Sequence, residues 1–293
     1  MPGLEFFGST DEAQVTERIA DAEIVLLNKF ALSRDRLYAA TRLKLICLAA
    51  TGTDNVDLAA ARERDIAVCN VRGYCSQSVM QQVWAMILGL TQHVQEYTDL
   101  AKDGSWVRSE VFTVLKLPIR ELSGLTFGVV GWGELGRATA KAAQAFGMRV
   151  IIANRPGGPR EPGRYDLDSL LAMSDVISLH CPLTPATRHL IGVRELALMK
   201  PNALLINTAR GGLIDGQALA AALKAGRLGG AGIDVLPQEP PVDGDPLLDP
   251  RIPNLLLTPH IAWAAREARQ RCLDEIAANV RDFLAGGRRA RVV

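Results

Sequence analysis

The sequence predicts an α/β protein with parallel sheets in two domains. Strand-like and helix-like segments alternate along the 293-residue chain, as in a series of βαβ units. The length is sufficient for two ordinary domains, and a glycine-rich turn at residues 131–136 opens a second series of such units. We expect residues 1–97 together with 266–293 to form one domain, and residues 98–265 to form the other.

Apolar periodicity and turn residues locate the individual elements. In the first domain we expect strands at residues 23–28, 45–49 and 66–70, and helices between them at residues 34–40 and 57–64. A long helix should follow, from a cap at Ser76 or Ser78 to Gly104. In the second domain we expect strands at residues 126–130, 149–153, 176–180, 204–207, 230–235 and 255–258. Its helices should lie at residues 137–146, 168–172, 192–199 and 217–225, before a last helix at 264–284 that returns to the first domain.

Composition excludes several classes of protein. Lys and Arg number 33 against 32 Asp and Glu, so no polyanion or nucleic-acid partner is indicated, and the three arginines in residues 288–291 are expected to be a solvated terminus. The five cysteines form no C-x-x-C pair, which favours a reducing cytoplasm. No leader is visible, the apolar residues 79–90 are too short to span a bilayer, and no cluster has metal-ligand spacing.

The glycine-rich turn predicts a dinucleotide site. Gly131, Gly133 and Gly136 form G-x-G-x-x-G directly after an apolar strand, and Glu134 and Leu135 lie where the turn opens a helix. These glycines permit a tight turn and close approach of the backbone to a pyrophosphate, whose charge then faces the helix amino terminus. A ligand-free βα turn is the alternative, but strand, loop and helix together favour binding.

The end of the next strand bears on which coenzyme is used. An acidic residue that would bind the ribose 2′-hydroxyl is expected near residue 154, where this chain has Asn154 followed by Arg155. An asparagine does not repel a 2′-phosphate, and Arg155 could pair with it, with Arg160 or Arg164 nearby. Arg155 could instead be a solvated loop residue. The coenzyme is therefore NADP or NAD, with NADPH favoured.

Three polar residues follow apolar strands at the edge of the sheet where ligands bind. Arg210, Glu239 and His260 could each have a structural role, as a strand-end ion pair, an exposed loop acid and a helix cap. Together, downstream of a dinucleotide loop, they meet the needs of 2-keto acid reduction. Arg210 would hold the carboxylate and polarise the carbonyl, and His260 would deliver the proton. Glu239 would accept a hydrogen bond from the other imidazole nitrogen and favour the charged form of the ring.

Several segments resemble the D-2-hydroxyacid dehydrogenase family over nearly the whole chain. They are the glycine loop and residues 50–57 (ATGTDNVD), 180–184 (HCPLT), 207–215, 234–241 and 259–263. The resemblance implies two doubly wound domains, a Rossmann coenzyme domain and a flavodoxin-like substrate domain. Residues 28–29, 71–74 and 260–263 are most similar to the branch of glycerate dehydrogenases and hydroxypyruvate reductases.

The resemblance also implies roles for residues that spacing alone does not single out. The backbone around Thr51 and Gly52 would grip the substrate carboxylate together with Arg210. Other residues would contact the coenzyme from its adenine through its phosphates to its nicotinamide: Cys181, Pro182, Thr187, Thr208, Ala209 and Asp234.

These observations predict NAD(P)H-dependent reduction of a short 2-keto acid, hydroxypyruvate or glyoxylate, to the D-2-hydroxy acid. A D-lactate-type or 3-phosphoglycerate-type dehydrogenase is one alternative, and a dinucleotide-sensing corepressor on the same scaffold is another. We also expect a homodimer, built around the long helix and the irregular residues 105–121 with Trp106 and Phe112.

Overall fold

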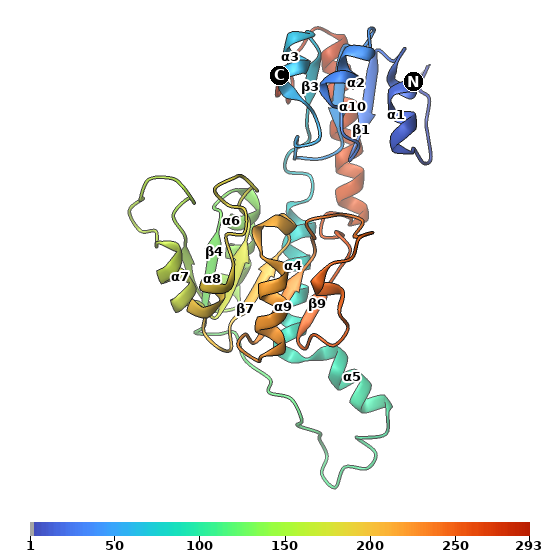
Figure 1. Cartoon of the computed structure of the whole chain (residues 1–293). Coiled ribbons are helices and arrows are strands. Elements are labelled where there is room, and N and C mark those ends of the chain that lie inside the picture. Colours follow the sequence, from blue (N-terminus) through green and yellow to red (C-terminus); the bar gives the residue numbers. More distant parts are fainter. Residues whose placement is uncertain (1–2) are drawn as a thin grey trace. The chain divides into compact units, whose positions relative to one another are not determined.

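The computed structural model describes residues 3–293, which divide into two compact units. The first unit combines the chain up to Cys75 with Arg266–Val293, and the second is Ser76–Ala265 (Figure 1). Residue 266 begins the returning segment in both the sequence-based division and the structure. The other boundary lies after Cys75 rather than after residue 97. The helix that begins at Ser76 therefore lies wholly in the second unit.

The first unit is a small parallel sheet with helices. Its strands are β1 (Ile24–Leu27), β2 (Leu45–Leu48) and β3 (Ala67–Cys69), in the order β1-β2-β3. Its helices are α1 (Val15–Ile19), α2 (Arg34–Ala39), α3 (Leu58–Glu63) and α10 (Arg266–Leu284). Ile46 and Leu48 share one hydrophobic cluster with side chains of α2 and α3. Because side chains alternate between the two faces of a sheet, the other side chains of β2 point to the opposite face. Helix α10 packs against this central strand.

The C-terminal segment is docked on this sheet. Arg291 pairs with Cys69 in an antiparallel bridge, and the Val292 N–H donates to the Val68 carbonyl at 2.7 Å. Arg289 forms an ion pair with Glu275 at 2.6 Å. The arginine side chains are exposed, as expected, but the expectation of a merely solvated terminus is wrong, because the backbone extends the sheet beyond β3.

The second unit is a six-stranded parallel sheet with helices. Its strands are β4 (Thr126–Val130), β5 (Arg149–Ile152), β6 (Val176–Leu179), β7 (Leu204–Asn207), β8 (Gly230–Ile233) and β9 (Leu255–Leu257). The spatial order is β5-β4-β6-β7-β8-β9, and every neighbouring pair is parallel. Its helices are α4 (Ser76–Gln92), α5 (Val94–Lys102), α6 (Glu134–Ala145), α7 (Leu167–Met173), α8 (Val193–Leu198) and α9 (Gly216–Lys224).

Aromatic stacking and small strand residues fix α4 in the second unit. The Trp84 ring stacks on Phe127 of β4 and on Phe146, with centroids 5.8 and 4.6 Å away. β8 reads Gly-Ala-Gly-Ile, and a Cβ added at Gly232 would lie 2.8 Å from the Met86 Cβ. The glycine therefore lets the helix approach the sheet closely, which explains why α4 belongs to this core.

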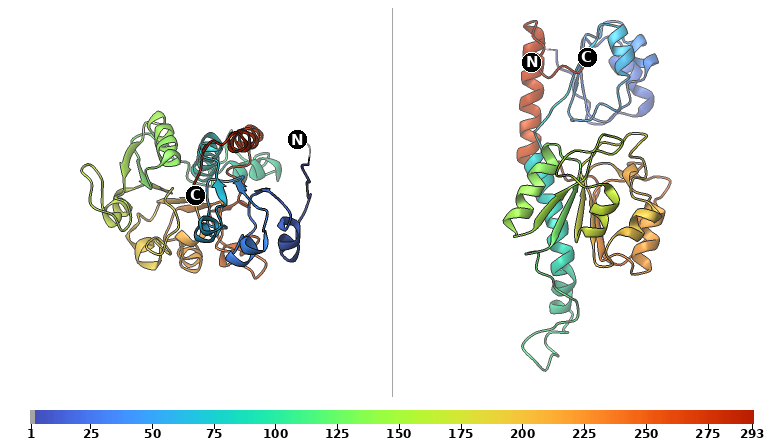
Figure 2. Two further views of the ribbon diagram at one scale, coloured as in Figure 1. Left: turned by 90° about the horizontal axis from the view of Figure 1, so that it is seen from above. Right: turned by 90° about the vertical axis from the view of Figure 1, so that its left-hand side faces the viewer.

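The long helix expected from Ser76 to Gly104 is broken, so that expectation is wrong. His93 has a left-handed backbone conformation, with φ 49°, and separates α4 from α5. We call α5 and the irregular residues 103–120 the arm, and it projects away from the rest of the second unit (Figures 1 and 2). The arm closes at its base, where the Arg120 N–H donates to the Thr91 carbonyl at 3.1 Å.

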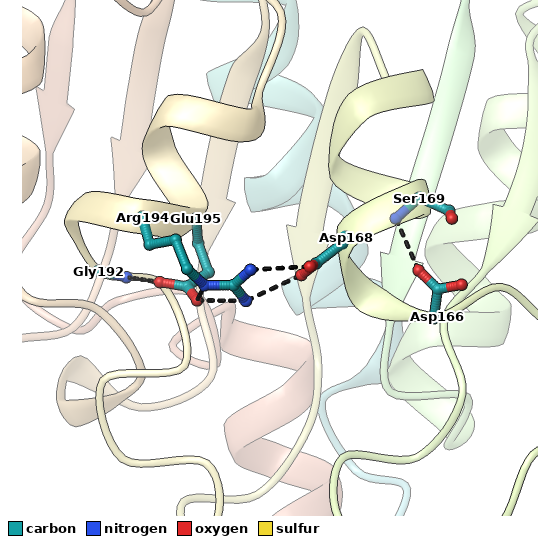
Figure 3. Close-up of polar contacts among 6 residues, drawn as sticks. All are labelled: Asp166, Asp168, Ser169, Gly192, Arg194 and Glu195. Atoms are coloured by element: carbon teal, nitrogen blue, oxygen red, sulfur yellow. Dashed lines mark hydrogen bonds and ion pairs between the residues drawn. The ribbon is translucent and has the colours of Figure 1, made fainter.

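A charged contact joins α7 to α8 (Figure 3). The Arg194 guanidinium donates to both carboxylate oxygens of Asp168, at 2.7 and 2.9 Å, and holds the pKa of that carboxyl below its usual value. Glu195 accepts from the Gly192 N–H at 3.1 Å at the start of α8. Because α7 precedes β6 and α8 follows the loop after it, the contact braces both sides of a segment that carries candidate site residues.

Within residues 3–293, no helix combines the length and apolar character needed to cross a membrane.

Large apolar side chains on the arm are exposed: Trp106, Val107, Val111, Phe112, Leu115 and Ile119. We predict that a second copy of the chain covers them, because such a cluster is costly in water and two-fold dimers are the commonest oligomer. Light scattering should give twice the 31.6 kDa chain mass. Val107→Asp with Phe112→Asp should give the monomer, while Val193→Asp, an exposed change on α8, should not. A monomer mass for the unaltered protein at micromolar concentration would refute the dimer.

Candidate active site

The glycine loop lies where the chain changes direction across the sheet. β4 is flanked by β5 on one side and β6 on the other, and the carboxyl ends of strands at such a switch point form the ligand crevice of open α/β sheets. Gly131 follows β4 with φ 105°, and a Cβ there would lie 2.5 Å from the Cys181 nitrogen. Only glycine therefore fits between the ends of these two strands.

The other two glycines have different environments. A Cβ at Gly136 would lie 2.1 Å from the Gly131 carbonyl oxygen, so this residue permits close packing of α6 on the loop. At Gly133, by contrast, an added Cβ would meet no atom within 4 Å. Gly133 is the N-cap of α6, whose free N–H groups favour an anion. The loop thus fits a pyrophosphate approaching at Gly133.

A second observation supports a ligand at this edge. The Thr208 hydroxyl, just after β7, is buried and has no hydrogen-bond partner among the described residues. A buried hydroxyl without a partner is costly unless a ligand or water satisfies it. The residue lies where the nicotinamide end of a dinucleotide is expected, and Ala209 beside it is half-buried. The residues present therefore fit a nicotinamide dinucleotide.

Asn154 and Arg155 follow β5, the strand that flanks β4 on the side opposite β6. The Asn154 Oδ1 accepts from the Glu161 N–H at 2.8 Å and so shapes the loop after the strand. The exposed Arg155 side chain forms no hydrogen bond or ion pair within residues 3–293. Arg164, by contrast, is paired with Glu161 at 2.7 Å.

The segment after β6 is held largely by its own contacts. The Thr187 hydroxyl donates to the Pro182 carbonyl at 2.8 Å and accepts from the Thr184 N–H at 2.7 Å, so it fixes the turn. Cys181 is buried, and burial raises the pKa of its thiol to about 11. Pro182 is exposed.

Arg210 is positioned by Asn207, the last residue of β7. The Asn207 side chain accepts from the Ala209 N–H at 3.0 Å and donates to the Arg210 carbonyl at 2.9 Å, bracketing the turn. Asn207 is fully buried and Arg210 is half-buried. The sequence analysis missed Asn207 as a positioning residue. The signal was an amide side chain ending an otherwise apolar strand.

Glu239 and His260 form a direct pair. The His260 Nδ1 and Glu239 Oε2 atoms are 2.5 Å apart, and the other Glu239 oxygen accepts from the Leu236 N–H at 3.0 Å. An ionised carboxylate can only accept, so Nδ1 carries the proton of this contact. The opposite ring nitrogen, Nε2, is left for a reacting group, as a proton donor requires.

The segment that carries His260 is held by Asp234. This residue follows β8 and is 1% exposed, and its carboxylate accepts from the Thr258 hydroxyl, the Ile261 N–H and the Ala262 N–H at 2.5 to 2.9 Å. Its carbonyl accepts from the His260 N–H at 2.7 Å. His260 itself has φ 55°. Asp234 thus fixes the backbone on both sides of His260.

The elements that bear Arg210 and Glu239 also touch. A Cβ at Gly211 would lie 2.0 Å from the Leu236 carbonyl carbon, so the turn after β7 lies against the segment leading to Glu239. Arginine, glutamate and histidine are therefore presented along one edge of the sheet, after β7, β8 and β9. Thr51 and Gly52 belong to the first unit, where the Thr51 hydroxyl donates to the Val71 carbonyl at 2.8 Å.

Gly133→Val tests the dinucleotide loop. The valine side chain would enter open space beside the α6 amino terminus, so we expect coenzyme dissociation constants to rise at least about tenfold. The unfolding midpoint should fall only slightly, because valine is a poorer N-cap than glycine. Fluorescence titration and thermal unfolding measure both. Gly8→Val, also in open space but in the first unit, is the control. Unchanged coenzyme affinity in Gly133→Val would argue against the assignment.

The low pKa of His180 should make the unfolding free energy of the protein fall at acidic pH. Burial lowers the pKa of this imidazole to about 4 from 6.5, so between these values the unfolded chain binds more protons and stability falls as the pH drops. From about pH 7.5 to about pH 5 this group alone should remove about 2 kcal/mol of unfolding free energy. His180→Gln should reduce that loss in denaturant titrations, whereas the exposed His189→Gln should retain it. Equal pH dependence in both variants would contradict the prediction.

Comparisons with known proteins agree with this geometry. A family model for the D-isomer specific 2-hydroxyacid dehydrogenase, NAD binding domain, matches residues 84–262. Glycerate dehydrogenase of Methylorubrum extorquens is 44% identical over 282 residues, covering 96% of this chain and 89% of the relative. Hydroxypyruvate reductase of Blautia hydrogenotrophica is 37% identical, covering 94% of this chain and 87% of the relative.

Solved structures share the fold as well. A crystal structure of a Thermus thermophilus protein gives a TM-score of 0.88 at 38% identity, covering 97% of this chain and 90% of that one. An acyclic imino acid reductase in complex with NADPH and D-Arg gives 0.85 at 29% identity, covering 98% and 91%. D-lactate dehydrogenase of Aquifex aeolicus, complexed with NAD and lactic acid, gives 0.81 at 32% identity, covering 92% and 85%.

The sheet edge thus combines a dinucleotide loop with an arginine and a histidine–glutamate pair, and the sequence matches run through these same elements. A family model that covers more than half of the chain, and a relative 44% identical across nearly all of it, agree on one assignment. This protein belongs to the family of D-isomer specific 2-hydroxyacid dehydrogenases.

Proposed function

We propose that this protein reduces a short 2-keto acid, hydroxypyruvate or glyoxylate, to the corresponding D-2-hydroxy acid, with NADPH preferred as the reductant. The observation that carries the proposal is the 2.5 Å contact between His260 and Glu239 on the same sheet edge as the Arg210 turn. The relatives named glycerate dehydrogenase and hydroxypyruvate reductase support the choice of substrate.

Each residue has a task in this reaction. A bound nicotinamide coenzyme would supply the hydride. The Arg210 guanidinium binds the substrate carboxylate and polarises the carbonyl that gains negative charge. His260 delivers its Nε2 proton to the carbonyl oxygen, and the Glu239 carboxylate stabilises the charged ring before transfer. The family resemblance assigns further N–H donors for the carboxylate to the backbone at Thr51 and Gly52.

The coenzyme preference rests on the end of β5. A carboxylate there would accept from the ribose 2′-hydroxyl and repel a 2′-phosphate. The Asn154 oxygen accepts from the Glu161 N–H, and the side-chain amide nitrogen adds a donor at the end of β5. Arg155 adds a cation without an acidic partner in the described chain. Two donors and no carboxylate favour the phosphorylated ribose.

Arg210→Ala and His260→Ala test the reaction. Each should lower kcat/KM for hydroxypyruvate and glyoxylate about 10²–10³-fold, because each removes an interaction made with developing charge or with the transferred proton. Coenzyme affinity should remain within a few-fold. Arg251→Ala, an exposed arginine paired with Asp249, should retain full activity. Near-normal turnover in either site variant would refute the assignment, and a lack of turnover of every 2-keto acid by the unaltered protein would refute the function.

Asn154→Asp combined with Arg155→Ala tests the coenzyme preference. We expect the ratio of kcat/KM for NADPH over NADH to be greater than one in the unaltered protein and less than one in the double variant. The change should lie mainly in the coenzyme KM, because the ribose phosphate is remote from the hydride. Arg160→Ala is the control for loss of a loop arginine. A ratio below one in the unaltered protein would show that NADH is preferred.

A further inference from the structure

Two polar side chains of helix α4 contact the segment that carries His260. We define the acid segment as residues 258–265. The Ser78 hydroxyl donates to the Ala262 carbonyl at 2.6 Å and accepts from the Ala265 N–H at 3.3 Å. One turn further along α4, the Gln82 side-chain amide donates to the Thr258 hydroxyl at 3.3 Å. The helix therefore holds both ends of the acid segment.

These contacts close a ring with Asp234. Starting from Ser78, the ring passes through Ala262 to the Asp234 carboxylate, then through the Thr258 hydroxyl to Gln82. Ser78 and Gln82 are four residues apart on one helix and so lie on the same face. Ser78 is 6% exposed and Asp234 is 1% exposed, so water competes little for the bonds that these two side chains make.

The ring joins residues on both sides of His260, whose backbone conformation needs outside support. His260 is not glycine, yet its φ is 55°, in the left-handed region that side chains disfavour. Such a conformation persists only where the surroundings over-determine it. Asp234 supplies the restraint at 258, 261 and 262, but the bonds of its carboxylate do not extend to Ala265. The second anchor of the acid segment, at its far end, is Ser78.

We propose that Ser78 is a positioning residue for His260, with Gln82 as its partner on the same face of α4. The proposal rests on the function proposed above, in which His260 delivers the proton. Neither side chain reaches the reacting atoms in this role. They hold the backbone on both sides of the histidine, so that Nε2 stays in line with the substrate oxygen. Small errors in such a distance are costly in rate.

Ser78→Ala should therefore slow proton delivery and leave coenzyme binding intact. We expect kcat to fall about tenfold, the coenzyme dissociation constant to stay within twofold, and the solvent deuterium isotope effect on kcat to rise, because proton transfer limits the rate more. The matched control is Ser174→Ala at the end of α7. Ser174 is also buried and also donates to a backbone carbonyl at 2.6 Å. Both substitutions should lower the free energy of unfolding by similar amounts, but only Ser78→Ala should change the solvent deuterium isotope effect.

A second pair of variants keeps the test decisive if Ser78→Ala does not fold. Gln82→Met preserves length and removes the donor to Thr258, and Gln81→Met makes the same change at the exposed neighbouring position. The proposal expects a lower kcat and a larger isotope effect for Gln82→Met alone. Values for Ser78→Ala and Gln82→Met that match those of Ser174→Ala and Gln81→Met would overturn it.

The measurement separates this inference from the proposed function. If His260→Ala retains turnover, histidine is not the acid and the proposed function fails, and with it the basis for a positioning role. If His260→Ala loses turnover while Ser78→Ala and Gln82→Met behave like their controls, the function stands and the positioning role alone is overturned. Loss of coenzyme affinity in Ser78→Ala, in proportion to the loss of kcat, would also overturn it, because the effect would then not be specific to the proton donor.

Discussion

The candidate site of the second unit depends on the buried carboxylate of Asp234. A carboxylate that is 1% exposed is stable only when donors compensate for lost water. Here the donors are one hydroxyl and two backbone N–H groups of a single short segment. The hydrogen bonds that compensate the Asp234 carboxylate are therefore the same bonds that determine the conformation of residues 258–262. His260 adopts its left-handed conformation because the residues on both sides of it are committed to Asp234.

Close backbone contacts do the corresponding work on the coenzyme side. Gly131 brings the end of β4 against the end of β6, and Gly211 brings the end of β7 against the segment beyond β8. Each contact joins neighbouring carboxyl ends of the sheet without an intervening side chain. The residues of the candidate site are thus presented from short turns at the ends of strands, and this support holds the distances between them.

The sequence predicted most of the fold because its signals are local. The strands at residues 126–130 and 204–207 are largely apolar and are followed by Gly131 and Thr208, and the structure reproduces the bounds of both strands. The break at His93 was missed because no glycine or proline marks it. The placement of α4 was missed because an amphipathic pattern does not say which core it will face. That choice depended on Trp84 meeting Phe127 and Phe146.

The sequence singles out residues for the candidate site, but it does not show the hydrogen bonds that connect them. Arg210, Glu239 and His260 stand out because each is polar directly beyond an apolar strand or in the loop that follows one. The part that Ser78 plays is absent from any local pattern, because its partners are 184 and 187 residues away. Ser78 instead looked like a helix cap, a common use of serine. Hydrogen bonds between distant segments arise only from the packed fold.

The discontinuous first unit has a consequence for how the chain matures. The second unit is one uninterrupted stretch, Ser76–Ala265, whereas the first needs α10 and the strand-like residue Arg291, which are made after that stretch. A chain emerging from the ribosome therefore completes its second unit before its first. Until residues 266–293 arrive, β2 lacks the helix that packs on it and β3 has an open edge. The first unit of the nascent protein should need chaperone protection until residues 266–293 have been made.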